Sequence, residues 1–284
     1  MTVAELGFVK PGTLDEALAA LARPGSMLLG GGTSIGILLK NRLIEPERLV
    51  WVGALAELSG ISLDEDGAIR IGAAATLRDL ARSELLQGAV PVLPDAAGRI
   101  GNPRVRAVAT LGGALVHGDP RQDLPPVLLA LRSQATIAAP GGTRTVGLDG
   151  FYLDFMEVAL GEGEVVTDVL VPSRSGWRDR YSRFTPGSED DYPTVGVAVS
   201  LRLGDGGLID DAEIALGGVD SRPILATEAA RSLIGTSGAG TALEEAARNA
   251  AGHCDPSDDA RGSADYKRKM VDVWVRRTVA ACLS

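Results

Sequence analysis

The fold of this chain is decided by the stretch RAVATLGGALVHGDPRQDLPPVLLAL, residues 106–131. It holds a pair of glycines, Gly112 and Gly113, after a β-branched and apolar run. Glycine has no Cβ, so the backbone at such a pair can come within hydrogen-bonding distance of a ligand phosphate. The end of the stretch, 124–131, is apolar and predicts a buried helix.

A second stretch upstream, LLGGGTSIGILLK at residues 28–40, repeats this design. An apolar strand leads into a glycine turn, two hydroxyl side chains and an apolar helix start. Backbone amides in a glycine turn form an anion-binding concavity, and a helix N-terminus adds about half a positive charge. We therefore expect the two loops to hold one diphosphate. The residues with that role are Gly31, Gly32, Thr33, Ser34, Gly112 and Gly113.

Spacing excludes two other phosphate-binding motifs. A Walker loop ends in Gly-Lys followed by Ser or Thr, and no such tripeptide occurs in the chain. A dinucleotide fingerprint needs glycine at its first, third and sixth positions. Counted from Gly30 the sixth residue is Ile35, and counted from Gly31 the third is Thr33, so neither start fits.

Both stretches resemble the FAD-binding medium subunit of the molybdenum hydroxylases, the family of carbon monoxide dehydrogenase and of the xanthine dehydrogenase flavin domain. In that family the first loop typically reads Ala-Gly-Gly-Thr and then Ser or Asp, which matches residues 30–34. The second reads Ala-Thr-Ile-Gly-Gly-Asn, a short spacer, and Asp-Pro-x-x-Asp-Leu-Pro-Pro, which matches 109–114 and 119–126. Gly30 replaces a common alanine, and Ala114 replaces an asparagine and so removes a hydrogen-bonding side chain.

The resemblance spans nearly the whole chain and implies an α+β fold. A two-lobed FAD-binding domain of the PCMH type is followed by a smaller C-terminal domain, in which an antiparallel sheet packs against helices. Composition shifts at Pro172, which predicts a boundary. We expect the FAD-binding domain over 1–172, with lobes at about 1–57 and 58–172, and the C-terminal domain over 173–284.

Periodicity and turn residues predict the secondary structure of these units. In the FAD-binding domain we expect a helix opened by the capping box 13–16, further helices over 35–41, 91–100 and 124–131, and strands over 27–29, 49–52, 135–138 and 164–171. In the C-terminal domain strict alternation predicts a half-buried strand over 195–203 and another strand over 211–216. Helices are expected near 227–233, from the capping box 241–244, and over 264–283.

The resemblance also implies which residues contact FAD. They are Leu29, Gly30, Gly31, Gly32, Thr33, Ser34, Ile35, Ala109, Thr110, Gly112, Gly113, Asp123, Val166 and Tyr192. Asp123 has two interpretations, contact with the flavin or a cap on the helix that follows it, and the resemblance favours the flavin. Tyr192 either covers the isoalloxazine ring or is an ordinary edge-strand tyrosine. For His117, packing at the loop edge is favoured over contact with the flavin.

The implied function is electron transfer, with no catalytic acid, base or nucleophile in this chain. Partners would be a large molybdopterin subunit and a small subunit with two [2Fe–2S] clusters, as a dimer of heterotrimers. The turn from Arg99 to Arg106 is the expected approach of the cluster subunit, and the basic stretch 174–183 a weaker candidate. The alternative to a partner contact is that these arginines are simply solvated at the surface. Arg106 could instead brace its own loop. Alternatives for the whole chain are a self-contained FAD-dependent oxidoreductase and a cofactor-free scaffold, at which only Ala114 hints.

Composition limits the other function classes. The 284 residues are 45% apolar, enough for two domains with cores. A net charge of −9 argues against nucleic-acid binding, and basic clusters such as 174–183 are expected to be solvated faces or partner contacts. No apolar run reaches the roughly 20 residues of a membrane span, and Met1 to Glu5 carry no leader signature, so we expect a cytoplasmic protein. Two cysteines and two histidines cannot supply a cluster or a closed zinc site, and no metal ligands are expected.

Overall fold

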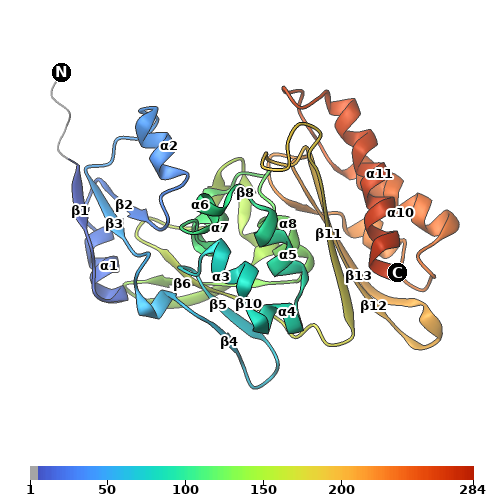
Figure 1. The fold of residues 1–284 in the computed structure, drawn as a ribbon, viewed down its shortest axis with the longest axis horizontal. Helices are drawn as coiled ribbons and strands as arrows, with labels where there is room; N and C mark the ends of the chain where they lie inside the picture. Colours follow the sequence, from blue (N-terminus) through green and yellow to red (C-terminus); the bar gives the residue numbers. More distant parts are fainter. Residues whose placement is uncertain (1–5) are drawn as a thin grey trace.

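A computed structural model describes residues 6–284 of the chain. The expectation that rests on Met1 to Glu5 lies outside the described residues. The structure is α+β, as predicted, and its units follow one another along the long axis in Figure 1, from the N-terminal strands to the C-terminal helices. Short 3-10 helices lie at Ala56–Leu58, Leu148–Gly150 and Asp205–Gly207.

The first lobe is a small parallel sheet with the order β1-β3-β2. Its strands are β1 (Gly7–Val9), β2 (Ser26–Leu29) and β3 (Arg48–Trp51), and its helices are α1 (Leu14–Leu21) and α2 (Ile35–Lys40). The predicted capping box is half formed. The Thr13 hydroxyl accepts from the Glu16 amide, but the Glu16 carboxylate accepts from Gly12 instead of from Thr13. The chain then reaches α2 through the first glycine loop.

The second lobe is an antiparallel sheet with the order β4-β5-β10-β6-β7, covered by short helices. The strands are β4 (Ile61–Leu63), β5 (Ile69–Gly72), β6 (Gln134–Ala139), β7 (Gly142–Gly147) and β10 (Val165–Val171), and β8 (Tyr152–Asp154) pairs with β9 (Glu157–Val158) beside them. The helices are α3 (Leu77–Arg82), α4 (Glu84–Ala89), α5 (Val92–Arg99), α6 (Pro103–Arg106), α7 (Leu111–His117) and α8 (Leu124–Ala130). Every residue of α8 is buried, which confirms the helix predicted at the end of the opening stretch.

The third unit is the predicted antiparallel sheet with helices on one face (Figure 1). It contains β11 (Trp177–Phe184), β12 (Val195–Leu203), β13 (Ile209–Gly217), β14 (Ile224–Leu225), α9 (Thr227–Arg231), α10 (Gly240–His253) and α11 (Ala264–Leu283). The last helix is confirmed at both ends. The capping box expected at Thr241 is wrong, because α10 begins one residue earlier and Ala239, at its N-cap, provides no side-chain hydrogen bond.

The strand predicted over 195–203 is confirmed as β12, but the prediction that it is half-buried is wrong. Valines 195, 197 and 199 pack against the C-terminal helices, but Ala198 and Ser200 on the opposite face are also buried. Ala198 belongs to the core of the second lobe, since α8 lies against this face of β12. The sheet is therefore enclosed between α8 and the layer of α10 and α11, and its small residues allow α8 to approach.

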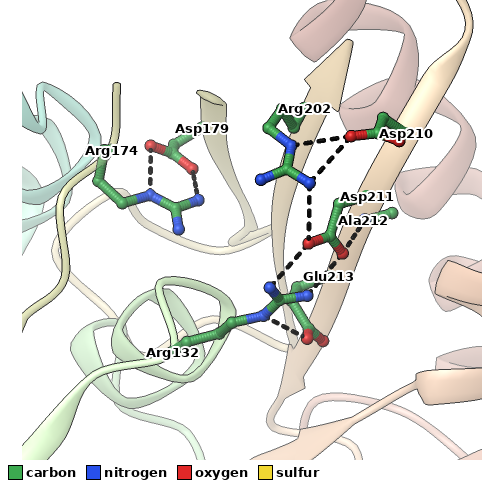
Figure 2. A network of polar contacts seen from close by, with 8 residues as sticks. All are labelled: Arg132, Arg174, Asp179, Arg202, Asp210, Asp211, Ala212 and Glu213. Carbon is green, nitrogen blue, oxygen red and sulfur yellow. Dashed lines mark hydrogen bonds and ion pairs between the residues drawn. The ribbon is translucent and has the colours of Figure 1, made fainter. Parts of the chain in front are cut away.

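The basic stretch 174–183 is a solvated face only in part, since Arg178 and Arg180 are exposed. Most of it forms β11, which the sequence analysis did not predict, and its first arginine, Arg174, is buried in a bidentate contact with Asp179 (Figure 2). The Arg174 guanidinium also lies 4.1 Å from the centroid of the Trp177 ring. Nearby, Arg132 at the end of α8 donates to both Asp211 and Glu213 of β13. These contacts join the second lobe to the C-terminal sheet.

None of the helices that the structure describes has both the length and the apolar character that a membrane crossing requires. Residues 6–284 also contain no group of three or more His, Cys, Asp or Glu side chains able to hold a metal ion.

Burial on both faces of β12 predicts how the strand responds to a polar side chain. Replacing Ala198 with Gln puts an amide against α8 and overpacks that interface, so we expect the free energy of unfolding to fall by about 2–4 kcal/mol. Thermal unfolding measures the effect, with Thr145→Gln on the exposed part of β7 as the control. A strand with one solvated face would tolerate both changes equally, and equal melting temperatures would contradict the enclosed sheet.

Candidate functional site

A cavity of about 670 Å³ lies where the two glycine loops meet. It is lined by residues of the first lobe, including Ile37, and of the second, including Leu124. The predicted contact residues that line it are Gly30, Gly31, Gly32, Thr33, Ser34, Ile35, Ala109, Thr110, Gly112, Gly113, Asp123, Val166 and Tyr192. Leu29 alone of the predicted set is not part of the lining. The tertiary fold thus brings residues far apart in sequence to one cavity.

The two loops are packed directly on each other. A Cβ on Gly31 would overlap the carbonyl oxygen of Val108, and a Cβ on Gly30 would come within 2.8 Å of the Thr110 hydroxyl oxygen. A Cβ on Gly112 would lie 2.8 Å from the Cβ of Ala73. These distances are shorter than side chains allow. The glycines are therefore required by contacts within the protein, a reason that the sequence analysis did not anticipate.

Hydrogen bonding distinguishes the two loops as anion sites. The amide of Gly112 donates to the Ala73 carbonyl at 2.8 Å, and the amide of Gly113 donates to the Thr110 hydroxyl at 3.1 Å. In the first loop, by contrast, no carbonyl within residues 6–284 accepts from the amides of residues 31–34. The expectation that both loops present free amides is therefore not met. The first loop presents them, and the second supports the first.

Asp123 is buried in the wall of the cavity and does not cap α8, because its side chain accepts no amide of that helix. Its carboxylate instead accepts from the Tyr181 hydroxyl at 2.9 Å and lies 3.0 Å from Nε of Arg183, both on β11. Burial raises the pKa of Asp123 to about 6, although the Arg183 charge and the Tyr181 hydrogen bond oppose that rise. The alternative of a helix cap is thus wrong, and flavin contact stays a prediction.

Tyr192 reaches the cavity from the segment between β11 and β12 and is 40% exposed. The Arg121 guanidinium lies 5.5 Å from the centroid of its ring. Arg121 is held by two hydrogen bonds to the Asp119 carboxylate, at 2.9 and 2.8 Å. Burial alone would raise the pKa of Asp119, but the hydrogen bonds from Arg121 outweigh it and lower that pKa. Both charged groups beside Tyr192 are therefore already paired.

Two further positions singled out by the sequence lie at the wall. His117, at the end of α7, is half-buried there, and burial lowers the pKa of its imidazole. Ala114 lines the cavity and packs against the core of the second lobe, so the wall is apolar where an asparagine is usual.

The turn between α5 and α6 has both a braced and an exposed part. Nη1 of Arg106 donates to the carbonyls of Ile100 and Gly101, so this arginine braces its own loop. Arg104 is exposed, and Arg99 pairs with Asp95 while half of its side chain stays in solvent. The turn is therefore accessible beside the second glycine loop.

Several wall residues were missed by sequence reasoning. They are apolar positions on elements that the glycine motifs do not include, such as Met27, Val52, Leu58, Val105 and Met156. Nothing in the sequence separates these from ordinary core residues. The β11 partners of Asp123 carried a weak signal, since Tyr181 and Arg183 alternate with the exposed Arg178 and Arg180.

The comparisons with known proteins agree with this geometry. Residues 4–174 match the family described as the FAD binding domain in molybdopterin dehydrogenase, and residues 180–282 match the CO dehydrogenase flavoprotein C-terminal domain. The chain belongs to this family of FAD-binding subunits. It is an oxidoreductase component, and FAD is its cofactor.

The relatives that follow match over more than nine tenths of their length. The chain is 36% identical to the carbon monoxide dehydrogenase medium chain of Hydrogenophaga pseudoflava, over 95% of this chain and 94% of that one. It is 28% identical to the xanthine dehydrogenase FAD-binding subunit of Escherichia coli O157:H7, over 96% and 94%. A solved structure of carbon monoxide dehydrogenase from Hydrogenophaga pseudoflava superposes with a TM-score of 0.95 at 33% identity, covering 99% of this chain and 98% of that one.

The residues of this FAD-binding subunit fit the cofactor. A volume of about 670 Å³ lies within the range of roughly 300–1,000 Å³ typical of ligand sites. The free amides of the first loop suit a diphosphate. The apolar side chains in the wall, such as Val52, Leu58 and Val166, suit an aromatic ring system.

The contact between the glycine loops predicts the effect of a single methyl group. In Gly31→Ala the new Cβ overlaps the Val108 carbonyl, so the loops must separate, and we expect loss of bound FAD together with a lower melting temperature. Gly36→Ala is the matched control, because nothing lies within 4 Å of a Cβ at that helical position. It should keep FAD and gain up to about 1 kcal/mol of stability. Full flavin absorbance in purified Gly31→Ala would show that the contact is dispensable.

Asp123 predicts a pH dependence of stability. An unfolded aspartate titrates near pH 3.9, so a folded pKa of about 6 means that the folded state holds this proton more tightly. The contribution to the free energy of unfolding is therefore full below about pH 4 and is lost as the pH rises through about 6, with a size of order 2–3 kcal/mol. Urea unfolding of the FAD-free chain at pH 4.5 and 7 measures it.

Asp123→Asn cannot titrate, so it should lack this decline even though losing the Arg183 partner lowers its stability at both pH values. If wild type and variant lose the same stability between pH 4.5 and 7, the carboxyl of Asp123 does not titrate in that window.

Proposed function

We propose that this chain is the electron-transfer subunit of a molybdenum hydroxylase complex. It would take electrons from the [2Fe–2S] clusters of a small partner subunit and pass them through FAD to an external acceptor. The organic substrate would react on a large molybdopterin subunit, and the assembly would be a dimer of heterotrimers. The observation that carries the proposal is a cavity with free amides at one end, in a chain of this family, together with the engagement of its lining carboxylate, Asp123, by Tyr181 and Arg183.

The pairing of Asp119 and Asp123 with neighbouring side chains supports a role for this chain in binding and orienting FAD. Asp119 is bound to Arg121, and Asp123 is bound to Tyr181 and Arg183. A general base must be free to take a proton from substrate, and groups held in buried pairs are better suited to orienting the cofactor. The flavin itself supplies the one- and two-electron chemistry when bound.

The residues of the chain then have separate tasks. Amides 31–34 would bind the diphosphate, and the hydroxyls of Thr33 and Ser34 lie in the same wall. Asp123 and Val166 would contact the isoalloxazine or ribityl part, and Tyr192 would cover the ring. The domains would divide at about residue 172, with the FAD-binding domain before it and 173–284 after it.

The partner subunits are proposed from the relatives. Their names, medium chain and FAD-binding subunit, describe one component of a larger enzyme. The exposed turn from Arg99 to Arg106 adjoins the second glycine loop and is the proposed approach of the cluster subunit. An obligate interface of this kind buries on the order of 2,000 Å² or more in total.

Electron entry through a partner gives a direct test. The purified chain is loaded with FAD, and flavin bleaching is followed after adding the substrate that reduces the native complex. We expect no bleaching in the chain alone and rapid bleaching when the partner subunits are present, because the chain would have no pocket in which to oxidise that substrate.

Photochemical reduction of the same sample controls for a competent flavin. Rapid reduction of the isolated chain by substrate would overturn the proposal in favour of a self-contained flavoenzyme. Failure of the chain to bind FAD would favour the scaffold.

A further inference from the structure

One arginine joins the cavity wall to the segment that carries Tyr192. Nε of Arg183 lies 3.0 Å from the Asp123 carboxylate, and its side chain is only 7% exposed. Nη1 donates to the carbonyl of Glu189 at 2.9 Å, and Nη2 donates to the carbonyl of Asp191. The guanidinium therefore bridges the start of α8 and the loop 185–192.

The loop has little else to hold it. Its residues from 186 to 192 are exposed, and the contact of the Tyr192 ring with the Arg121 guanidinium, 5.5 Å from the ring centroid, is itself partly exposed and therefore weak. A second anchor is the ion pair between Arg261 and the Asp191 side chain, 2.7 Å long, with the Asp191 side chain half exposed. Exposed pairs stabilise little, whereas hydrogen bonds from a buried charge are among the stronger ones. The position of the loop thus depends mainly on Arg183.

The same guanidinium also binds the second lobe at another point. Nη1 donates to the Arg99 carbonyl at the end of α5, at 2.7 Å. Arg183 is therefore fixed from the side of Asp123 and of α5, and its remaining donors determine where the loop lies. A guanidinium provides this because its five donors form a rigid planar fork, whereas a lysine ammonium is a point charge on a flexible stem.

We propose that Arg183 is a positioning residue that holds Tyr192 over the flavin and so limits how closely an external acceptor approaches the ring. This inference rests on the proposed function, in which Tyr192 covers FAD. Arg183 acts through the loop carbonyls and does not itself touch the acceptor. Its charge also pairs with the Asp123 carboxylate. The experiment must therefore separate the effect of holding the loop from the effect of pairing with Asp123.

Arg183→Lys separates them, because it keeps a positive charge near Asp123 but cannot serve all the carbonyls. The readouts, on the full chain loaded with FAD and without partners, are flavin fluorescence yield, collisional quenching by iodide, and the reoxidation rate of photoreduced flavin by dioxygen. We expect the loop to exchange between a position over the ring and one away from it, and loss of one charge-assisted hydrogen bond lowers the ratio of these two states by on the order of tenfold, so each readout should rise. Arg180→Lys is the matched control on the same strand, since Arg180 is exposed and only contacts the carbonyl of Ala281.

A double-mutant comparison shows whether the effect passes through Tyr192. Tyr192→Ala should raise the same readouts, and Arg183→Lys added to it should change nothing further. If Arg183→Lys leaves iodide quenching unchanged while Tyr192→Ala raises it, Tyr192 covers the flavin ring but Arg183 does not position it, and the inference is overturned. Additive effects, or no effect of Tyr192→Ala, also overturn the inference.

If Arg183→Lys does not fold, a second variant keeps the test available. Asp123→Leu combined with Arg183→Met replaces the buried pair with apolar groups, a change that proteins often tolerate. Its excess iodide quenching must vanish in the Tyr192→Ala background. These measurements need no partner subunit, so they succeed or fail independently of the proposed electron path, and failure of the wild-type chain to bind FAD would count against the proposed function instead.

Discussion

The contact between Gly31 and the Val108 carbonyl is the constraint on which the site depends. It joins the first lobe to the second at the cavity and places free amides of one loop opposite the supported turn of the other. The lobes have separate sheets but share a buried apolar core, in which Leu18 and Val50 pack with Ala138 and Val165, so the glycine contact sets the spacing only at the cavity. A steric requirement between two backbones, with no side chain involved, thus sets the shape of the cavity where the two loops meet.

The C-terminal sheet has a corresponding dependence on α8. Because β12 is buried on both faces, the second lobe and the C-terminal helices share one sheet. The same packing brings β11 behind the cavity wall, where Tyr181 and Arg183 meet the wall residue Asp123. The C-terminal unit therefore supports the cavity wall through β11 and contributes Tyr192 to its lining. Arg132 and Arg174 stabilise this arrangement at a point away from the cavity (Figure 2).

Charge in and around the cavity is neutralised locally. Arg121 pairs with Asp119, Arg183 with Asp123, and Arg261 with Asp191. Burying a charge is costly unless a partner is close, so each pair makes the position of one segment depend on another. The cavity is lined mainly by apolar atoms and backbone amides, which suits a cofactor whose own ring carries the electrons.

The sequence by itself determined the family, the cofactor, both glycine loops and most helices and strands, because glycine motifs and periodicity are local signals. All the residues that the sequence predicted to contact FAD line the cavity in the structure, except Leu29. The sequence could not show that the amides of Gly112 and Gly113 donate hydrogen bonds within the protein. Nor could it show that Asp123 faces Tyr181 and not its own helix, or that Arg183 is buried. Those facts depend on which segments meet in space. Only tertiary packing decides that, since burial and pairing are properties of neighbours far apart in the chain.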